Sequence, residues 1–150
     1  MARAAGRKRA VGTRAGRVSV AETAARREVL ETARAMSRQG LSPGRSGNVS
    51  ARYADGILIT PSGMAYDAIE PAEVVRVRLD GHVADGQRKP SSELQFHLAT
   101  YRARPDVGAI VHTHSMHATV LACARRPIPA FHYMVAIGGG EDIPLVPYAT

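Results

Sequence analysis

The sequence has few cysteines and no long apolar run. Cys123 is the single cysteine among 150 residues, which excludes an internal disulfide. It lies in the apolar stretch 118–124, where we expect a small buried thiol rather than a nucleophile. No apolar segment is long enough to cross a membrane. We therefore expect a cytoplasmic protein with no part in a membrane.

Acidic residues are absent from positions 1–17, which hold six arginine or lysine residues. The whole chain has a formal net charge of +7, so residues 18–150 carry only +1. The positive charge is thus a property of the N-terminal segment, and we expect no nucleic-acid-binding face. The segment lacks the apolar stretch of a secretory signal and only faintly resembles a transit peptide. Residues 1–19 are interpreted as a disordered tail or the product of an early start codon, and residues 20–150 as one domain.

His112 and His114 follow the apolar run 107–111, which predicts a buried strand. Residues two apart in a strand point to the same face, so the two imidazoles leave the strand end side by side. Imidazole suits Zn²⁺, and a catalytic zinc usually takes three protein ligands. The pair therefore indicates part of a metal site. Two hydrogen-bonded histidines without a metal are the alternative.

The segment Pro90-Ser91-Ser92-Glu93 opens an apolar pattern and predicts a helix start with serine caps. Free N–H groups and hydroxyls at such an end bind anions such as phosphate. Glu93 is expected in the first turn, beside the bound group. A plain capping box with a solvated glutamate is the alternative.

Two turn segments offer further polar groups. Gly47 and Gly63 permit close backbone approach, while Asn48 and Ser62 supply side-chain hydrogen bonds. Residues 138–140 are three glycines without the spacing of a dinucleotide-binding fingerprint, so we interpret them as a flexible loop.

Hydrophobic periodicity and turn signals predict an alternation of helices and strands. Hairpins mixed with helices indicate an α/β fold in the broad sense, with much antiparallel pairing. Helices are expected at 21–39, 92–102 and 116–124, and strands at 48–51, 56–60, 74–79, 82–85, 108–112 and 144–146.

Six ordered motifs resemble the class II aldolase/adducin family over about residues 20–150. They are Gly47-Asn48-Val49-Ser50, Ile59-Thr60-Pro61-Ser62-Gly63, Pro90-Ser91-Ser92-Glu93, His112-Thr113-His114-Ser115, Pro129-Ala130-Phe131-His132-Tyr133 and Pro147-Tyr148-Ala149-Thr150. The resemblance implies a three-layer α/β/α sandwich with a largely antiparallel central sheet, whose C-terminal part is missing from this chain.

The resemblance also implies roles for individual residues. His112 and His114 match two of three zinc histidines, and Glu93 matches the general acid/base of the family's aldolases. Tyr133 matches a tyrosine that reaches into the active site of a neighbouring subunit, in a homotetramer. The positions that match the substrate-phosphate site are Asn48, Ser62, Gly63, Ser91 and Ser92.

The third zinc histidine of the family is expected beyond Thr150, so we interpret the chain as C-terminally incomplete. The other histidines do not match its position. His82, His97, His117 and His132 are read as surface or packing residues.

The implied reaction is the zinc-dependent, reversible cleavage of a ketose 1-phosphate into dihydroxyacetone phosphate and an aldehyde. A 4-epimerase or dehydratase of a ketose phosphate on the same scaffold is one alternative, although the epimerases generally carry aspartate in place of Glu93. A truncated, adducin-like interaction module without activity is another, against which the histidine pair counts.

Overall fold

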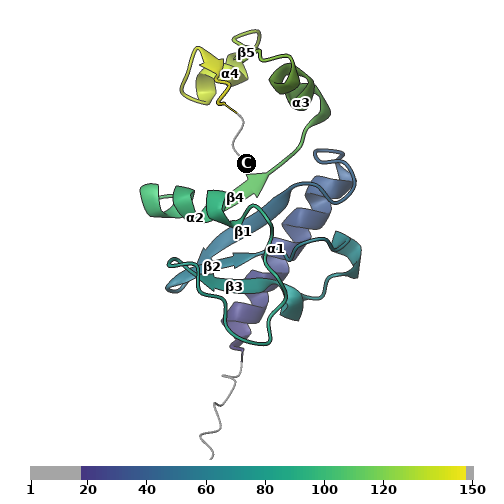
Figure 1. Ribbon diagram of the computed structural model, residues 1–150, viewed down its shortest axis with the longest axis vertical. Coiled ribbons are helices and arrows are strands. Elements are labelled where there is room, and N and C mark those ends of the chain that lie inside the picture. Colours follow the sequence, from purple (N-terminus) through teal and green to yellow (C-terminus); the bar gives the residue numbers. More distant parts are fainter. Residues whose placement is uncertain (1–17, 148–150) are drawn as a thin grey trace, which may run out of the picture.

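A computed structural model describes residues 18–147 (Figure 1). The predicted basic tail, except for its last two residues, lies outside the described part. No helix among residues 18–147 combines the length and apolar character needed to cross a membrane.

The centre of the molecule is a four-stranded antiparallel sheet with strand order β3-β2-β1-β4. Its strands are β1 (Asn48–Tyr53), β2 (Gly56–Ile59), β3 (Val75–Arg78) and β4 (Ala109–His112). The first three are neighbours in sequence, whereas β4 returns from a distance to pair with β1, Asn48 opposite His112. β4 is therefore an edge strand whose end lies beside the start of β1.

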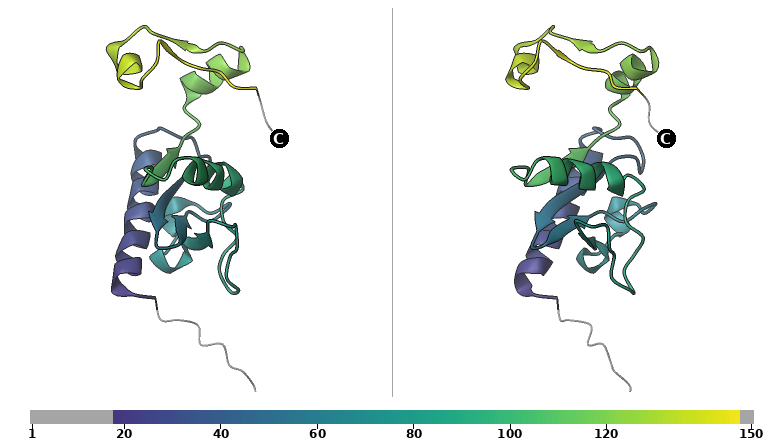
Figure 2. Two further views of the ribbon diagram at one scale, coloured as in Figure 1. Left: turned by 90° about the vertical axis from the view of Figure 1, so that its left-hand side faces the viewer. Right: turned by 60° about the vertical axis from the view of Figure 1, so that its left-hand side comes forward.

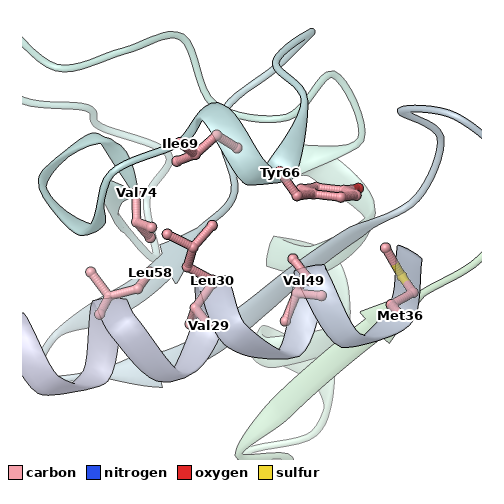
Figure 3. Packing of buried hydrophobic residues seen from close by; sticks show 9 residues of the cluster. Val29, Leu30, Met36, Val49, Leu58, Tyr66, Ile69 and Val74 are labelled. Atoms are coloured by element: carbon pink, nitrogen blue, oxygen red, sulfur yellow. The ribbon is translucent and has the colours of Figure 1, made fainter. Parts of the chain in front are cut away.

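Helix α1 (Val20–Arg38) covers one face of the sheet (Figure 2). Ser19 caps its N-terminus by accepting a hydrogen bond from the Glu22 backbone N–H, at 3.0 Å. Apolar residues at helical spacing form a stripe that packs onto the sheet (Figure 3). The buried cluster consists of Val29, Leu30, Ala33, Met36, Val49, Leu58, Tyr66, Ile69 and Val74.

Helix α2 (Leu94–Ala103) covers the opposite face. Alternation along the strands divides their side chains, so that Leu58 packs under α1 while Ile57 and Ile59 pack under α2. This second cluster contains Ile57, Ile59, Val75, Val77, Leu94, Leu98 and Tyr101. The predicted three-layer α/β/α arrangement is thus confirmed, and we call residues 20–112 the sandwich.

The remaining elements form a C-terminal lobe, residues 116–147, which lies apart from the sandwich beyond the end of β4 (Figures 1 and 2). It contains α3 (Met116–Cys123), α4 (Tyr133–Ile137) and a short antiparallel pair of β5 (Ile128–Pro129) and β6 (Asp142–Ile143). Val135 is the one buried residue in this lobe.

Four sequence-based expectations were wrong. The run 107–111 was expected to form a buried strand, but β4 lies at the edge of the sheet and Ala109 and Val111 are exposed. Cys123 is exposed, in a helix α3 that has no buried residue. The predicted strand 82–85 is reduced to a single bridge between Val83 and Val77, and residues 144–146 form no strand. The sequence analysis also missed α4 and two short 3₁₀ turns, η1 (Tyr66–Ala68) and η2 (Pro71–Glu73).

Candidate active site

The two predicted histidines lie at the end of β4, on the side that faces the start of α2. Their Nε2 atoms are 3.0 Å apart, and Glu93 Oε1 lies 3.1 Å from His112 Nε2 and 3.7 Å from His114 Nε2. A tetrahedral zinc ion with bonds of about 2.0–2.1 Å holds its ligand atoms about 3.3 Å apart. The three groups therefore fit a shared divalent metal ion, with nitrogen and oxygen donors of the kind zinc takes.

Glu93 is the N-cap residue of α2 rather than a member of its first turn, and its side chain makes no capping hydrogen bond. The capping role goes to Ser91, whose Oγ accepts from the Glu93 backbone N–H at 3.2 Å. The carboxylate is thereby free to face the histidines, which rules out the plain capping box for this residue. Its second oxygen, Oε2, accepts a 2.6 Å hydrogen bond from Asn48 Nδ2.

The loop between α1 and β1 packs against the backbone of the segment that carries His112 and His114. The His114 backbone N–H donates to Ser42 Oγ at 3.1 Å, and Ser42 is buried. Gly47 lies with φ +80°, and a Cβ there would come within 2.7 Å of the His112 carbonyl oxygen. Only glycine accommodates both the left-handed backbone and this approach. The loop and the strand end are therefore packed as one unit.

A cavity of about 280 Å³ opens beside Glu93 and His114. An isolated bridge between Pro61 and Pro90 brings the two polar loops together, and the Ser62 N–H donates to the Lys89 carbonyl at 2.9 Å. All five residues predicted to hold phosphate line this cavity: Asn48, Ser62, Gly63, Ser91 and Ser92. The structure thus brings them to one site with the candidate metal-binding group.

Two further residues of the cavity were missed by the sequence analysis. Arg45 lines it and donates from Nη1 to the Gly63 carbonyl at 2.8 Å, and it adds a positive charge to a cavity that Glu93 also lines. Tyr66 donates its hydroxyl to the Gly47 carbonyl at 2.6 Å, while burial and then the Glu93 charge raise its pKa. The position of Arg45, two residues before Gly47, was the one available signal.

His97 is a fully buried histidine next to this site, which agrees with a packing rather than a surface position. Its Nε2 is hydrogen-bonded to Asn48 Oδ1, and its Nδ1 lies 2.7 Å from Ser50 Oγ. Burial, with a smaller effect from the positive form of His112, lowers the pKa of His97 to about 4. The imidazole is therefore neutral at pH 7. His82, His117 and His132 are exposed, as predicted.

Tyr133 is not brought to the site within this chain. It begins α4, which lies in the C-terminal lobe (Figure 1). Its side chain is 69% exposed and does not line the cavity. The candidate metal-binding residues and the cavity residues all lie in the sandwich or directly after β4.

The curated proteins with similar sequences include aldolases of sugar phosphates. The L-fuculose phosphate aldolase of Escherichia coli O6:H1 is 47% identical over 124 residues, which are 83% of this chain and 57% of that protein. The 5-methylthioribulose-1-phosphate/5-deoxyribulose-1-phosphate aldolase of Rhodospirillum rubrum is 50% identical over 127 residues, or 85% of this chain and 57% of that protein. The chain thus spans little more than half the length of these relatives.

Solved structures agree with the sequence comparison. An L-fuculose 1-phosphate aldolase superposes with a TM-score of 0.78 at 38% identity, over 85% of this chain and 60% of that one. The sequence profile of the Class II Aldolase and Adducin N-terminal domain matches residues 27–150. Fold, ordered motifs and profile agree, and the chain belongs to the class II aldolase and adducin family.

Proposed function

We propose that this chain carries the metal-binding and phosphate-binding part of a zinc-dependent aldolase that reversibly cleaves a ketose 1-phosphate. The observation that carries the proposal is the meeting of Glu93, His112 and His114 at one edge of a polar cavity. The relatives support it, since their names specify aldolases of L-fuculose phosphate and of 5-deoxyribulose 1-phosphate. The products would be dihydroxyacetone phosphate and an aldehyde.

The metal would be held by His112 and His114, with Glu93 at ligand distance when no substrate is present. A bound zinc ion supplies a Lewis acid that polarises the substrate carbonyl. Ser42 and Gly47 keep the histidine segment in place, so the two imidazoles are oriented before anything binds.

The phosphate would occupy the cavity that opens beside Glu93 and His114. Ser91 and Ser92 offer hydroxyls at the start of α2, and Asn48, Ser62 and Gly63 also line the cavity. Arg45 adds a charge-assisted donor for the dianion. Holding the phosphate at one end fixes which carbon of the substrate lies next to Glu93.

Glu93 is the proposed proton carrier. In cleavage, the C3–C4 bond breaks, the bonding electron pair passes to C3, and the C4 hydroxyl becomes the aldehyde by passing its proton to water by way of the Tyr133 phenol. The ionised Glu93 carboxylate takes up one proton from water and delivers it to C3, so no net proton is gained or lost, and the reverse direction runs the same transfers backwards. The hydrogen bond from Asn48 to Oε2 leaves Oε1 as the oxygen that faces the reaction.

Tyr133 would act on the aldehyde end from a neighbouring subunit. Its phenol is exposed in the lobe, where it is accessible to a second copy of the chain. We propose a homotetramer with active sites between subunits, and a phenol that orients or protonates the aldehyde oxygen.

Calorimetric titration of the metal-free chain with zinc tests the metal site. One equivalent should bind, more weakly than in a chain with a third zinc histidine, and His112→Ala or His114→Ala should abolish binding. His117→Ala, at an exposed position on α3, is the matched control and should leave binding unchanged. Zinc binding that survives both site substitutions would refute the assignment.

The reaction is tested by release of dihydroxyacetone phosphate from L-fuculose 1-phosphate and 5-deoxyribulose 1-phosphate, measured with a coupled reductase. Glu93→Gln should lower kcat by about 10²–10⁴-fold, because glutamine cannot carry the proton. In a complete aldolase, where a third histidine supplements His112 and His114, this variant should retain zinc. Loss of zinc from Glu93→Gln would instead make the carboxylate an essential ligand.

A further inference from the structure

A line of buried polar side chains runs from the far end of α2 to the proposed catalytic carboxylate. It crosses the interface between β1 and α2, where Asn48 and Ser50 of β1 meet His97 and Tyr101 of α2. The exposed fractions of Ser50 and His97 are 0%, of Tyr101 1% and of Asn48 3%. Such groups are stable in an interior only when their hydrogen bonds are satisfied.

The hydrogen-bond chemistry fixes the direction of each link. An ionised carboxylate only accepts, so Asn48 must present its NH₂ group to Glu93 Oε2, at 2.6 Å. The Asn48 carbonyl oxygen then faces His97 Nε2, which must carry the imidazole proton and donate it.

The remaining links follow from this tautomer. His97 Nδ1 has no proton and accepts from the Ser50 hydroxyl at 2.7 Å. Ser50 Oγ in turn accepts from the Tyr101 hydroxyl at 2.9 Å. No buried side-chain nitrogen or oxygen among residues 18–147 lacks a hydrogen-bond partner, so the polar atoms along this line are satisfied.

We propose that His97 is a positioning residue, which acts through Asn48 to set the orientation of the Glu93 carboxylate. A terminal amide can rotate by 180° with little change in shape, and such a rotation would turn the Asn48 oxygen toward the carboxylate. The Nε2–H of His97 makes that rotated state costly, because two donors would then face each other. Glu93 Oε1 is thereby kept toward the histidines.

This inference rests on the proposed function for its consequence in catalysis, and on the hydrogen bonds alone for its structural part. The two parts are tested separately. Nitrogen-15 NMR of the metal-free chain gives the His97 tautomer directly, and we expect a protonated Nε2 and an unprotonated Nδ1 at pH 7. The opposite tautomer would overturn the proposal.

Two neutral amide variants separate positioning from packing. His97→Gln places an amide near the former Nε2 and can still donate to Asn48, whereas His97→Asn places its amide near Nδ1 and cannot. The Asn48 side-chain amide should exchange with solvent at least tenfold faster in His97→Asn than in the wild type. In His97→Gln it should remain protected. Equal protection in both variants would overturn the proposal.

The same two variants, His97→Asn and His97→Gln, test the effect of His97 on catalysis. His97→Asn should lower kcat by about tenfold, with KM changed less than kcat, and His97→Gln should restore most of it. A loss of stability alone would instead lower the amount of active protein in both variants, with no difference between His97→Asn and His97→Gln in kcat per active molecule. If the wild type releases no aldehyde while the NMR results hold, the proposed reaction fails and the positioning of Asn48 stands.

Discussion

The sandwich and the C-terminal lobe differ in how their apolar side chains are covered. In the sandwich, apolar side chains from α1, the sheet and α2 form two buried clusters. In the lobe, large apolar side chains remain exposed: Met116, Val120, Phe131, Tyr133, Met134, Ile137, Ile143, Leu145 and Val146. The sandwich therefore contains the contacts that stabilise the site, whereas the lobe presents an uncovered apolar surface.

A matched pair of leucine substitutions should show this difference most strongly. Leu58 is fully buried in the first cluster, so Leu58→Ala should lower the free energy of unfolding by about 2–5 kcal/mol. Leu145 is 39% exposed in the lobe, and Leu145→Ala should cost less than about 1 kcal/mol. Urea unfolding followed by far-UV circular dichroism measures both. Equal losses would mean that the lobe contributes to the same cooperative core.

Acid should destabilise the sandwich through its buried histidine. Its pKa is about 4 in the folded chain against about 6.5 in an unfolded one, so the unfolded state binds the proton first. The stabilisation is complete above about pH 6.5 and is lost as the pH falls toward 4, by at most about 3 kcal/mol. His97→Gln should remove this part of the pH dependence in metal-free protein. His117→Gln, in the lobe, should keep it.

Removing the positive charge of Arg45, which lines the cavity in the sandwich, should weaken substrate binding, whereas removing an arginine of the lobe should not. Arg45→Gln should raise KM for a ketose 1-phosphate about tenfold. A charge-assisted hydrogen bond contributes roughly 1.5–3 kcal/mol, and the low end of this range applies because the Arg45 side chain is exposed to solvent. Arg126→Gln, an exposed arginine of the lobe, is the control and should leave KM unchanged. An equal effect on an unphosphorylated analogue would count against a phosphate contact.

The smallest effect on stability is expected from polar substitutions in the lobe. Met116→Gln and Val120→Gln replace side chains that are 70% and 61% exposed, so the free energy of unfolding should change by less than about 0.5 kcal/mol. Binding of the apolar dye ANS should fall, because part of the uncovered surface is removed. A large loss of stability would show that α3 packs against a covering surface in solution.

The sandwich could be predicted from sequence because its signals are local. Helical spacing in α1 and period-two alternation in the strands gave most element bounds to within one or two residues, and the resemblance gave the layers. The placement of His112 and His114 on one face also followed from strand geometry. Periodicity indicates which side chains should be buried but not which element covers them, and for that reason Cys123 was placed wrongly.

The polar line behind Glu93 could not be predicted for a related reason. Asn48, Ser50 and Arg52 alternate along β1 and mark one face as polar. Nothing local shows that this face is covered by α2, whose His97 and Tyr101 lie 49 and 51 residues away from their partners. Convergence of residues so distant in sequence depends on sheet pairing, which is a property of the whole fold.

The position of β4 has a consequence for the order of folding. This strand pairs with β1 across the intervening hairpin and α2, with Asn48 opposite His112. Contacts between distant parts of a chain form slowly, because the intervening loop must first be closed. During synthesis, α1 and the β1–β2–β3 meander can associate while the histidines are still unmade. We therefore expect the nascent protein to acquire a stable scaffold first and its metal-binding capacity in the final step of sheet assembly.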